Sequence, residues 1–276
     1  MEYEIICRIN KGMSKDAKLK IKDRDGILHL LRIMKKTKVT EKTLRQYSMM
    51  FNNFHGDRII RIDEINVENE YIELITEWIE GETLENMLPN MSKQEAYCLG
   101  RRSAQLLQKI NERGEQVILD CVTRQFVESE LNKYLCYFGK DSLFDLVWKR
   151  IDNLLNSREH YFLHSDFHVG NIMMNCNNEL ILVDIEKCET GAFYRDLGVN
   201  ETYNFHVSPS FAEGLISEYS GSESFSWQEY GINIAFFMVV FRNWKHNRNE
   251  KCDNIMNMYF QRHNMESFGE PLWIKS

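Results

Sequence analysis

The sequence predicts an α+β fold in which a small, strand-rich front part precedes a larger, mainly helical rear part. Two observations support this prediction. Short runs of alternating apolar and polar residues, separated by turn signals, fill residues 1–80. Further along the chain, apolar residues recur at helical spacing behind helix-start motifs. A short crossing segment near residues 77–82 separates the two regions, so we expect domains at 1–78 and 79–276.

The front part is expected to be a small antiparallel sheet with one helix packed against it. "YEIICRI", "AKLKIKD" and "GILHLLRIM" have the composition of three strands of a meander, the last one after an Asp-Gly turn. Residues 40–54 carry Leu44, Tyr47 and Phe51 on one stripe, which predicts a helix. "IIRIDEINVENEYIELITEWI" then predicts two more strands around a polar turn at 68–70.

The rear part is expected to be helical, with one embedded hairpin. Ser92 and Glu95 match a capping box, in which each side chain satisfies a backbone N–H of the other residue. Ser226 and Glu229 repeat the pattern before a second apolar helix. Between these helices, the strand "ELILVDI" follows "NIMM" after the polar turn "NCNN", which predicts a β-hairpin.

Composition limits the classes of protein that the chain can belong to. Its 276 residues carry a net charge of −7, which speaks against a general nucleic-acid binder. The most apolar run, residues 232–241, has about half the length that a membrane-spanning helix needs. The seven cysteines are scattered and form no CxxC pair, so we expect reduced thiols in a cytoplasmic protein.

The segment "HSDFHVGN" at residues 164–171 and the hairpin after it predict a phosphoryl-transfer site. The hairpin brings the loop before its first strand close to the end of its second strand, so Asn171 and Asp184 can approach one ion. Asp166 is then expected to lie beside that ion. Phosphoryl transfer uses a carboxylate near the acceptor hydroxyl and oxygen ligands for magnesium, and this set supplies both.

The same segment resembles a known family. "FLHSDFHVGNIMMNCNNELILVDIE" resembles the HGDxxxxN…IDF core of the aminoglycoside phosphotransferase family, which are small-molecule kinases with a protein-kinase-like fold. "NKGMSKDAKLKI" with "LLRIM" is similar to the opening strands and phosphate loop of that family, and "YIELITEWIEGETLENML" to its interlobe crossing. The resemblance implies a two-lobed fold, with a small antiparallel-sheet N-lobe that binds nucleotide and a larger, mainly helical C-lobe.

The resemblance also implies roles for individual residues. Asp166 would orient or deprotonate the acceptor hydroxyl, while Asn171 and Asp184 would hold Mg²⁺. The nucleotide would be contacted by backbone groups of Glu77 and Ile79 at the purine, with Thr76 behind it, and by Ser14 and its neighbours at the phosphates.

Two positions depart from the family pattern. Kinases of this fold use a strand lysine paired with a helix glutamate to hold the nucleotide phosphates. The matching positions here are Arg32 and Gln46. Arginine keeps the charge and binds phosphate bidentately, and glutamine can hydrogen-bond the guanidinium without neutralising it. We therefore expect an Arg32–Gln46 pair at the nucleotide, with altered affinity or catalysis.

Other interpretations of the same residues remain open. His164 and His168 could be ligands of a transition metal in a hydrolase, although the other histidines form no second cluster in the sequence. Asp166 could simply form an Asx-turn. Glu186 and Asp196 lie near the predicted site in the sequence, and a structural role is favoured for both.

The favoured function is transfer of the γ-phosphoryl group of ATP or GTP to a hydroxyl of a small molecule. By family resemblance this acceptor is an aminoglycoside antibiotic, which would make the chain an antibiotic-resistance enzyme that binds a nucleoside triphosphate and Mg²⁺. A kinase of another alcohol (a macrolide, a choline-like alcohol, a sugar or an amino acid) is the first alternative. A catalytically silent nucleotide-binding protein is the second, supported only by Arg32 and Gln46. No nucleic-acid or membrane partner is expected.

Overall fold

The computed structural model describes residues 2–10, 16–53, 55–112, 123–155, 161–222, 225–250 and 253–263. The chain divides into two compact units, of which unit 1 contains Met1–Asn86 and Gly170–Cys188, and unit 2 contains Met87–Val169 and Glu189–Ser276. This division differs from the predicted domains 1–78 and 79–276. The reason is the predicted hairpin, which hydrogen-bonds to Arg58–Ile59 of the front part and to Gly81–Thr83, so that the hairpin and residues 79–86 belong to unit 1.

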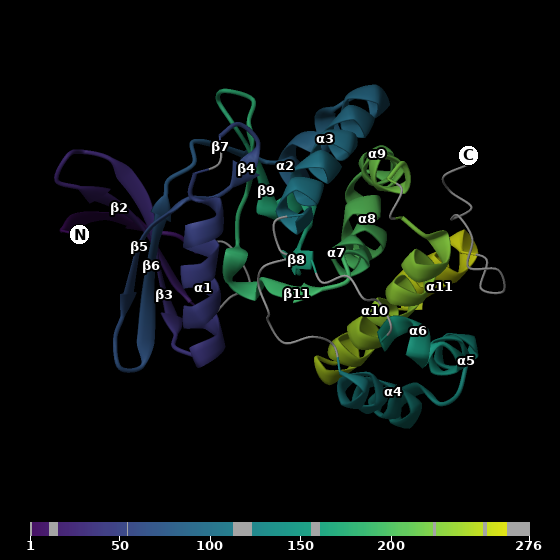
Figure 1. The fold of residues 1–276 in the computed structure, drawn as a ribbon. Coiled ribbons are helices and arrows are strands. Elements are labelled where there is room, and N and C mark those ends of the chain that lie inside the picture. The colour runs from purple at the N-terminus through teal and green to yellow at the C-terminus, as the bar shows by residue number, and fades with distance from the viewer. Residues whose placement is uncertain are drawn as a thin grey trace. The chain divides into compact units, whose positions relative to one another are not determined.

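Unit 1 contains a five-stranded antiparallel sheet with strand order β1-β2-β3-β6-β5 (Figure 1). The predicted meander and the pair of strands that follows the helix are confirmed by this order. The strands are β1 (Tyr3–Arg8), β2 (Ala17–Asp23), β3 (Leu28–Lys35), β5 (Ile62–Val67) and β6 (Tyr71–Glu77).

Helix α1 (Lys38–Phe51) packs its apolar stripe inside unit 1 beside this sheet (Figure 1). Leu44, Tyr47 and Phe51 are all buried, as the sequence predicts. The Tyr47 hydroxyl donates a hydrogen bond to the Ile60 carbonyl at 3.1 Å, so the one polar atom of this buried ring is satisfied. Burial raises the pKa of this phenol well above its usual value.

A second, four-stranded sheet also lies in unit 1, with strand order β4-β10-β9-β7. The predicted hairpin is confirmed as β9 (Ile172–Asn175) and β10 (Leu180–Leu182), which pair antiparallel. The flanking strands are β4 (Arg58–Ile59) and β7 (Gly81–Thr83). A Cβ added at Gly81 would lie 2.2 Å from the Met174 carbonyl oxygen, so only glycine allows β7 to approach β9 this closely.

Unit 2 is mainly helical. The short strands β8 (Tyr161–Leu163) and β11 (Glu189–Gly191) pair antiparallel within it. The longest helices are α3 (Lys93–Glu112), α4 (Arg124–Phe138), α9 (Pro209–Ser220) and α10 (Trp227–Asn247). The shorter helices are α2 (Leu84–Met87, at the junction of the units), α5 (Ser142–Lys149), α6 (Ile151–Leu155), α7 (Tyr194–Val199), α8 (Phe205–Val207) and α11 (Asp253–Arg262).

The two predicted capping boxes have different outcomes. In the first, the Ser92 N–H donates to Glu95 at 2.9 Å and the Glu95 N–H donates back to the Ser92 hydroxyl at 3.3 Å. In the second, only the Glu229 N–H donates to the Ser226 hydroxyl, at 3.4 Å. The Ser226 N–H donates instead to the buried Tyr194 hydroxyl at 2.7 Å, so a tertiary partner takes the place of the glutamate.

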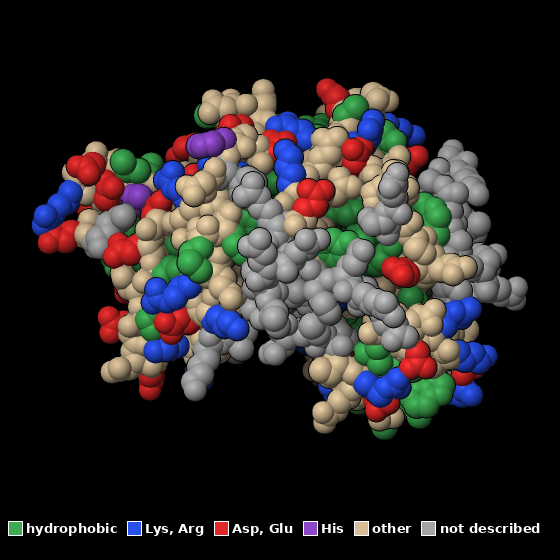
Figure 2. Space-filling model, viewed as in Figure 1, with side chains coloured by type: hydrophobic (Ala, Val, Ile, Leu, Met, Phe, Trp, Pro, Cys, Tyr) green, Lys and Arg blue, Asp and Glu red, His purple; other side chains and the backbone are tan. Residues whose placement is uncertain are grey.

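None of the helices in the described ranges is long and apolar enough to cross a membrane. In the face of unit 1 that Figure 2 shows, blue Lys and Arg side chains alternate with red Asp and Glu side chains. Such mixed charge is typical of a solvent-facing protein surface.

Candidate active site

The end of the β9–β10 hairpin brings Asn171 and Asp184 together. The Val183 N–H donates to the Asn171 carbonyl at 2.8 Å, immediately beyond the Ile172–Leu182 pair of the hairpin. Asp184 therefore follows directly after the residue that faces Asn171. Its backbone is left-handed, with φ 64° and ψ 56°. Such strain in a residue other than glycine persists only where its surroundings fix it, and it often marks a functional position.

Arg32 lies at the same hairpin end and contacts carboxylates on three sides. Its Nη1 donates to Asp184 Oδ1 at 2.5 Å and its Nη2 to Asp16 Oδ2 at 3.0 Å. Both nitrogens also donate to the Glu186 carboxylate, at 2.9 Å and 2.7 Å. The side chain is only 3% exposed. Glu186 is therefore the bidentate partner of Arg32, which agrees with the structural role favoured from the sequence, although the sequence did not indicate the partner.

The predicted Arg32–Gln46 pair is not formed. Gln46 is not among the hydrogen-bond partners of Arg32, and its buried Oε1 has no partner within the described part of the chain. The acid that neutralises Arg32 follows the hairpin instead of lying on helix α1. The helix position can be uncharged because Glu186 already supplies the counter-charge.

Within the described part of the chain, the charged side chains that pair around Asp184 sum to a negative value. Three carboxylates (Asp16, Asp184 and Glu186) meet two cations, Arg32 and Lys18, and the Lys18 Nζ lies 3.8 Å from Asp184 Oδ1. Burial acts to lower the pKa of Arg32, but the charges of Glu186 and Asp184 outweigh it and the pKa is raised. The guanidinium is therefore permanently charged, and among these described residues one negative charge is left over.

This donor set fits magnesium. Asn171 and Asp184 offer an amide oxygen and a carboxylate, and Mg²⁺ is usually held by one or two carboxylates together with waters and substrate phosphates. The described residues hold no cluster of three or more His, Cys, Asp and Glu side chains that could bind a metal. The transition-metal interpretation of His164 and His168 therefore gains no further ligands there.

Asp166 lies in unit 2, on a loop whose start is fixed by Asp196. The buried Asp196 carboxylate accepts the His164 N–H at 3.0 Å and the Ser165 N–H at 2.6 Å. It also accepts from the Asn111 amide at 3.4 Å. Ser165 is left-handed, with φ 63°. The hydrogen bonds to the Asp196 carboxylate therefore stabilise the strained backbone that immediately precedes Asp166.

The far side of the loop is held by Asn204, which belongs to a π-helix at Asn200–Asn204. Its Oδ1 accepts the Val169 N–H at 2.9 Å, and its Nδ2 donates to the Phe167 carbonyl at 3.5 Å. The Asp166 side chain, 24% exposed, lies between these anchors. Residues of π-helices often occur at functional sites, but the sequence pattern gave no signal for this one.

Replacing Asp196 with alanine is expected to destabilise unit 2 by about 2–4 kcal/mol, because the His164 and Ser165 N–H groups lose this acceptor and the Asn111 amide loses one of its two. Urea denaturation followed by circular dichroism measures the loss. Asp152→Ala is the matched control, since that carboxylate is 71% exposed on α6 of the same unit. Equal unfolding midpoints for the two variants would contradict the anchoring role of Asp196.

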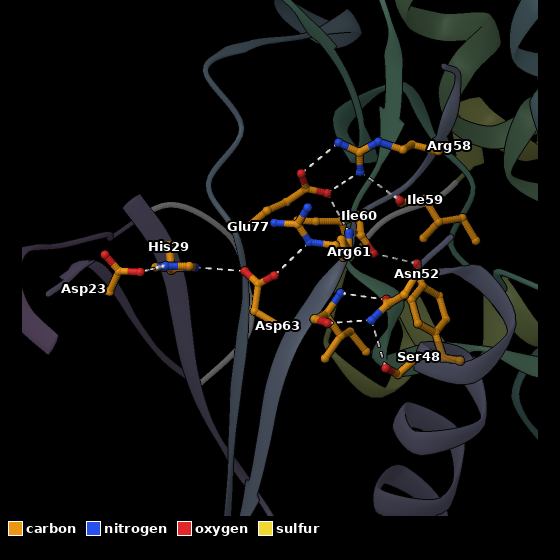
Figure 3. Close-up of polar contacts among 12 residues, drawn as sticks. Asp23, His29, Ser48, Asn52, Arg58, Ile59, Ile60, Arg61, Asp63 and Glu77 are labelled. Atoms are coloured by element: carbon orange, nitrogen blue, oxygen red, sulfur yellow. Dashed lines mark hydrogen bonds and ion pairs between the residues drawn. The ribbon is translucent and has the colours of Figure 1, made fainter. Parts of the chain in front are cut away.

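The predicted purine-contacting segment begins at the end of β6 (Figure 3). The Glu77 carboxylate forms a two-pronged ion pair with Arg58 and accepts the Arg61 N–H at 2.7 Å. The Glu77 N–H donates to the Arg61 carbonyl at 3.1 Å. These bonds join the end of β6 to β4, which pairs with β10. The predicted base-contacting segment and the strand that precedes Asp184 are thus connected within unit 1.

The other predicted nucleotide contacts have different outcomes. Thr76 is buried, and its hydroxyl has no hydrogen-bond partner within the described ranges, which suits a position facing a polar ligand. Ile79 follows β6 and is partly buried. Ser14 lies outside the described residues.

Comparison with solved structures identifies the fold. The chain superposes on aminoglycoside phosphotransferase APH(4)-Ia with 12% identity and a TM-score of 0.63, covering 93% of this chain and 94% of that one. Spectinomycin phosphotransferase APH(9)-Ia in complex with ADP and spectinomycin has 13% identity and a TM-score of 0.60, and the superposition covers 98% of this chain and 88% of that one. Choline kinase LicA from Streptococcus pneumoniae has 14% identity and a TM-score of 0.61, and the superposition covers 94% of this chain and 92% of that one. The fold is therefore the two-lobed, kinase-like fold predicted from the sequence.

A model of the phosphotransferase enzyme family matches residues 55–231, a range that includes Asp166, Asn171 and Asp184. The chain belongs to this family. No match was found among curated proteins.

Proposed function

We propose that this phosphotransferase moves the γ-phosphoryl group of ATP or GTP to a hydroxyl of a small molecule, with an aminoglycoside as the favoured acceptor. The observation that carries the proposal is the hairpin end, where Asn171 lies next to Asp184 and the described charged groups around Asp184 have an excess of negative charge. Such a cluster suits a divalent cation, and a nucleoside triphosphate brings the phosphate oxygens that complete the coordination of Mg²⁺.

Asp166 would act on the acceptor. A carboxylate on a loop held by Asp196 and Asn204 can accept the proton of a substrate hydroxyl and keep its oxygen directed at the phosphorus. Much of the rate in phosphoryl transfer comes from such positioning. Asn171 and Asp184 would hold Mg²⁺, which when bound neutralises charge on the phosphates.

The nucleotide would lie against the end of β6. Backbone groups of Glu77 and Ile79 would contact the purine, and the buried Thr76 hydroxyl would lie behind it. ADP in the structure of spectinomycin phosphotransferase supports an adenine nucleotide for this fold. Parallel assays with ATP and with GTP distinguish the two possible phosphoryl donors.

The acceptor proposal has one alternative with support of its own. The similar structures include a choline kinase as well as aminoglycoside phosphotransferases, and both kinds of acceptor are cationic alcohols. The net charge of −7 suits either. A choline-like alcohol is therefore the second candidate acceptor class.

The test uses the full chain with ATP or GTP, Mg²⁺ and a panel of aminoglycosides, choline-like alcohols, macrolides and sugars. We expect acceptor-dependent release of nucleoside diphosphate, with a gain of one phosphoryl group on the acceptor measured by mass spectrometry. Chelation of Mg²⁺ should abolish both signals. No nucleotide binding by calorimetry, together with no transfer to any acceptor, would overturn the proposal.

A further inference from the structure

Lys18 is a second cation at the proposed metal site, and the sequence gave it no role. It lies on β2 directly opposite Arg32 of β3, so the two side chains share one face of the sheet. The Lys18 Nζ is 3.8 Å from Asp184 Oδ1, the same oxygen that Arg32 contacts at 2.5 Å. The Lys18 side chain is 13% exposed.

Both terminal nitrogens of Arg32 are fully engaged by carboxylates. Each terminal nitrogen of a guanidinium carries two N–H groups, and the four of Arg32 match four hydrogen bonds to Asp16, Asp184 and Glu186. Its Nε is buried and has no hydrogen-bond partner within the described part of the chain. The terminal nitrogens of Arg32 could reach a phosphate only by breaking a charge-assisted hydrogen bond, and the Nε is buried.

Lys18 is placed differently. The one ion pair that it forms within the described ranges is too long for a hydrogen bond, and its ammonium carries three donors on a flexible stem. It can therefore turn toward an anion without breaking a short contact.

We propose that Lys18 supplies the cationic contact to the nucleotide phosphates, while Arg32 is a positioning residue that holds Asp184. This inference rests on the proposed phosphotransferase function. It also accounts for both departures from the family pattern. The arginine on β3 does not pair with a helix acid because Glu186 neutralises it, and Gln46 can then be uncharged.

The test is isothermal titration calorimetry of Lys18→Met with ADP, with a non-hydrolysable ATP analogue and with adenosine, all with Mg²⁺. Affinity for both phosphorylated ligands is expected to fall about 10- to 100-fold, the loss of one hydrogen bond between charged groups. Adenosine affinity and the melting temperature should not change. Lys18→Arg should retain most of the phosphate-dependent affinity.

Lys22→Met is the matched control, because Lys22 is an exposed lysine of the same strand. Arg32→Met provides the contrast: it should lower the melting temperature, since it leaves three carboxylates without their shared cation.

Two outcomes would overturn the inference. One is wild-type affinity of Lys18→Met for ADP and the ATP analogue, and the other is an equal loss in Lys22→Met. Failure of the proposed function is recognisable separately, because the unaltered protein would then bind no nucleotide. Lys18→Gln repeats the measurement with a polar side chain if the methionine variant does not fold.

Discussion

Asp166→Ala is expected to lower kcat by about 100- to 10,000-fold, the range typical of removing a general base, and to leave nucleotide affinity nearly unchanged. The loop should persist, because backbone N–H groups on both sides of Asp166 donate to the side chains of Asp196 and Asn204. The Asp166 side chain is partly exposed, so its removal leaves no large buried cavity. Steady-state kinetics with an identified acceptor, and calorimetry with nucleotide, measure the two quantities separately.

Two further variants sharpen this experiment. Asp166→Asn keeps the shape of the side chain but cannot take a proton, so it should be nearly as slow as the alanine variant. Asp152→Ala removes an exposed carboxylate of the same unit and should turn over like the unaltered protein. Normal turnover by Asp166→Ala would remove Asp166 from the reaction.

The sequence predicted the parts of the fold that depend on local pattern. The strands of the five-stranded sheet and the apolar stripe of α1 follow from periodicity. Asn171 and Asp184 could be placed together because a hairpin is a local structure, with its two ends fixed by a short turn. Strands β4 and β7 were missed because two or three residues show no alternation.

The sequence did not predict contacts between residues far apart in the chain. Glu186 lies 154 residues from Arg32 along the chain, and helix position 46 was chosen as the partner only by resemblance. Asp196 and Asn204 support the Asp166 loop from about 30 residues further along. Their role depends on how α7 and the π-helix pack, which a pattern of single residues does not reveal.

Asp184→Asn is expected to weaken nucleotide binding in the presence of Mg²⁺ by about 10- to 100-fold, because it removes the only charged ligand proposed for the ion. Asparagine tolerates the left-handed backbone that Asp184 adopts and can still accept a hydrogen bond from Arg32, so the variant changes charge more than structure. Calorimetry with and without EDTA measures the effect, and with EDTA the variant and the unaltered protein should bind alike.

Asp16→Asn is the matched control for this charge change. Asp16 is also a carboxylate partner of Arg32, at 3.0 Å, but it is not a proposed metal ligand. If Asp184 binds Mg²⁺, only its variant should lose the magnesium dependence of nucleotide binding. If the two variants behave alike, the effect comes from the charge around Arg32, and Asp184 is then a counter-ion and not a ligand.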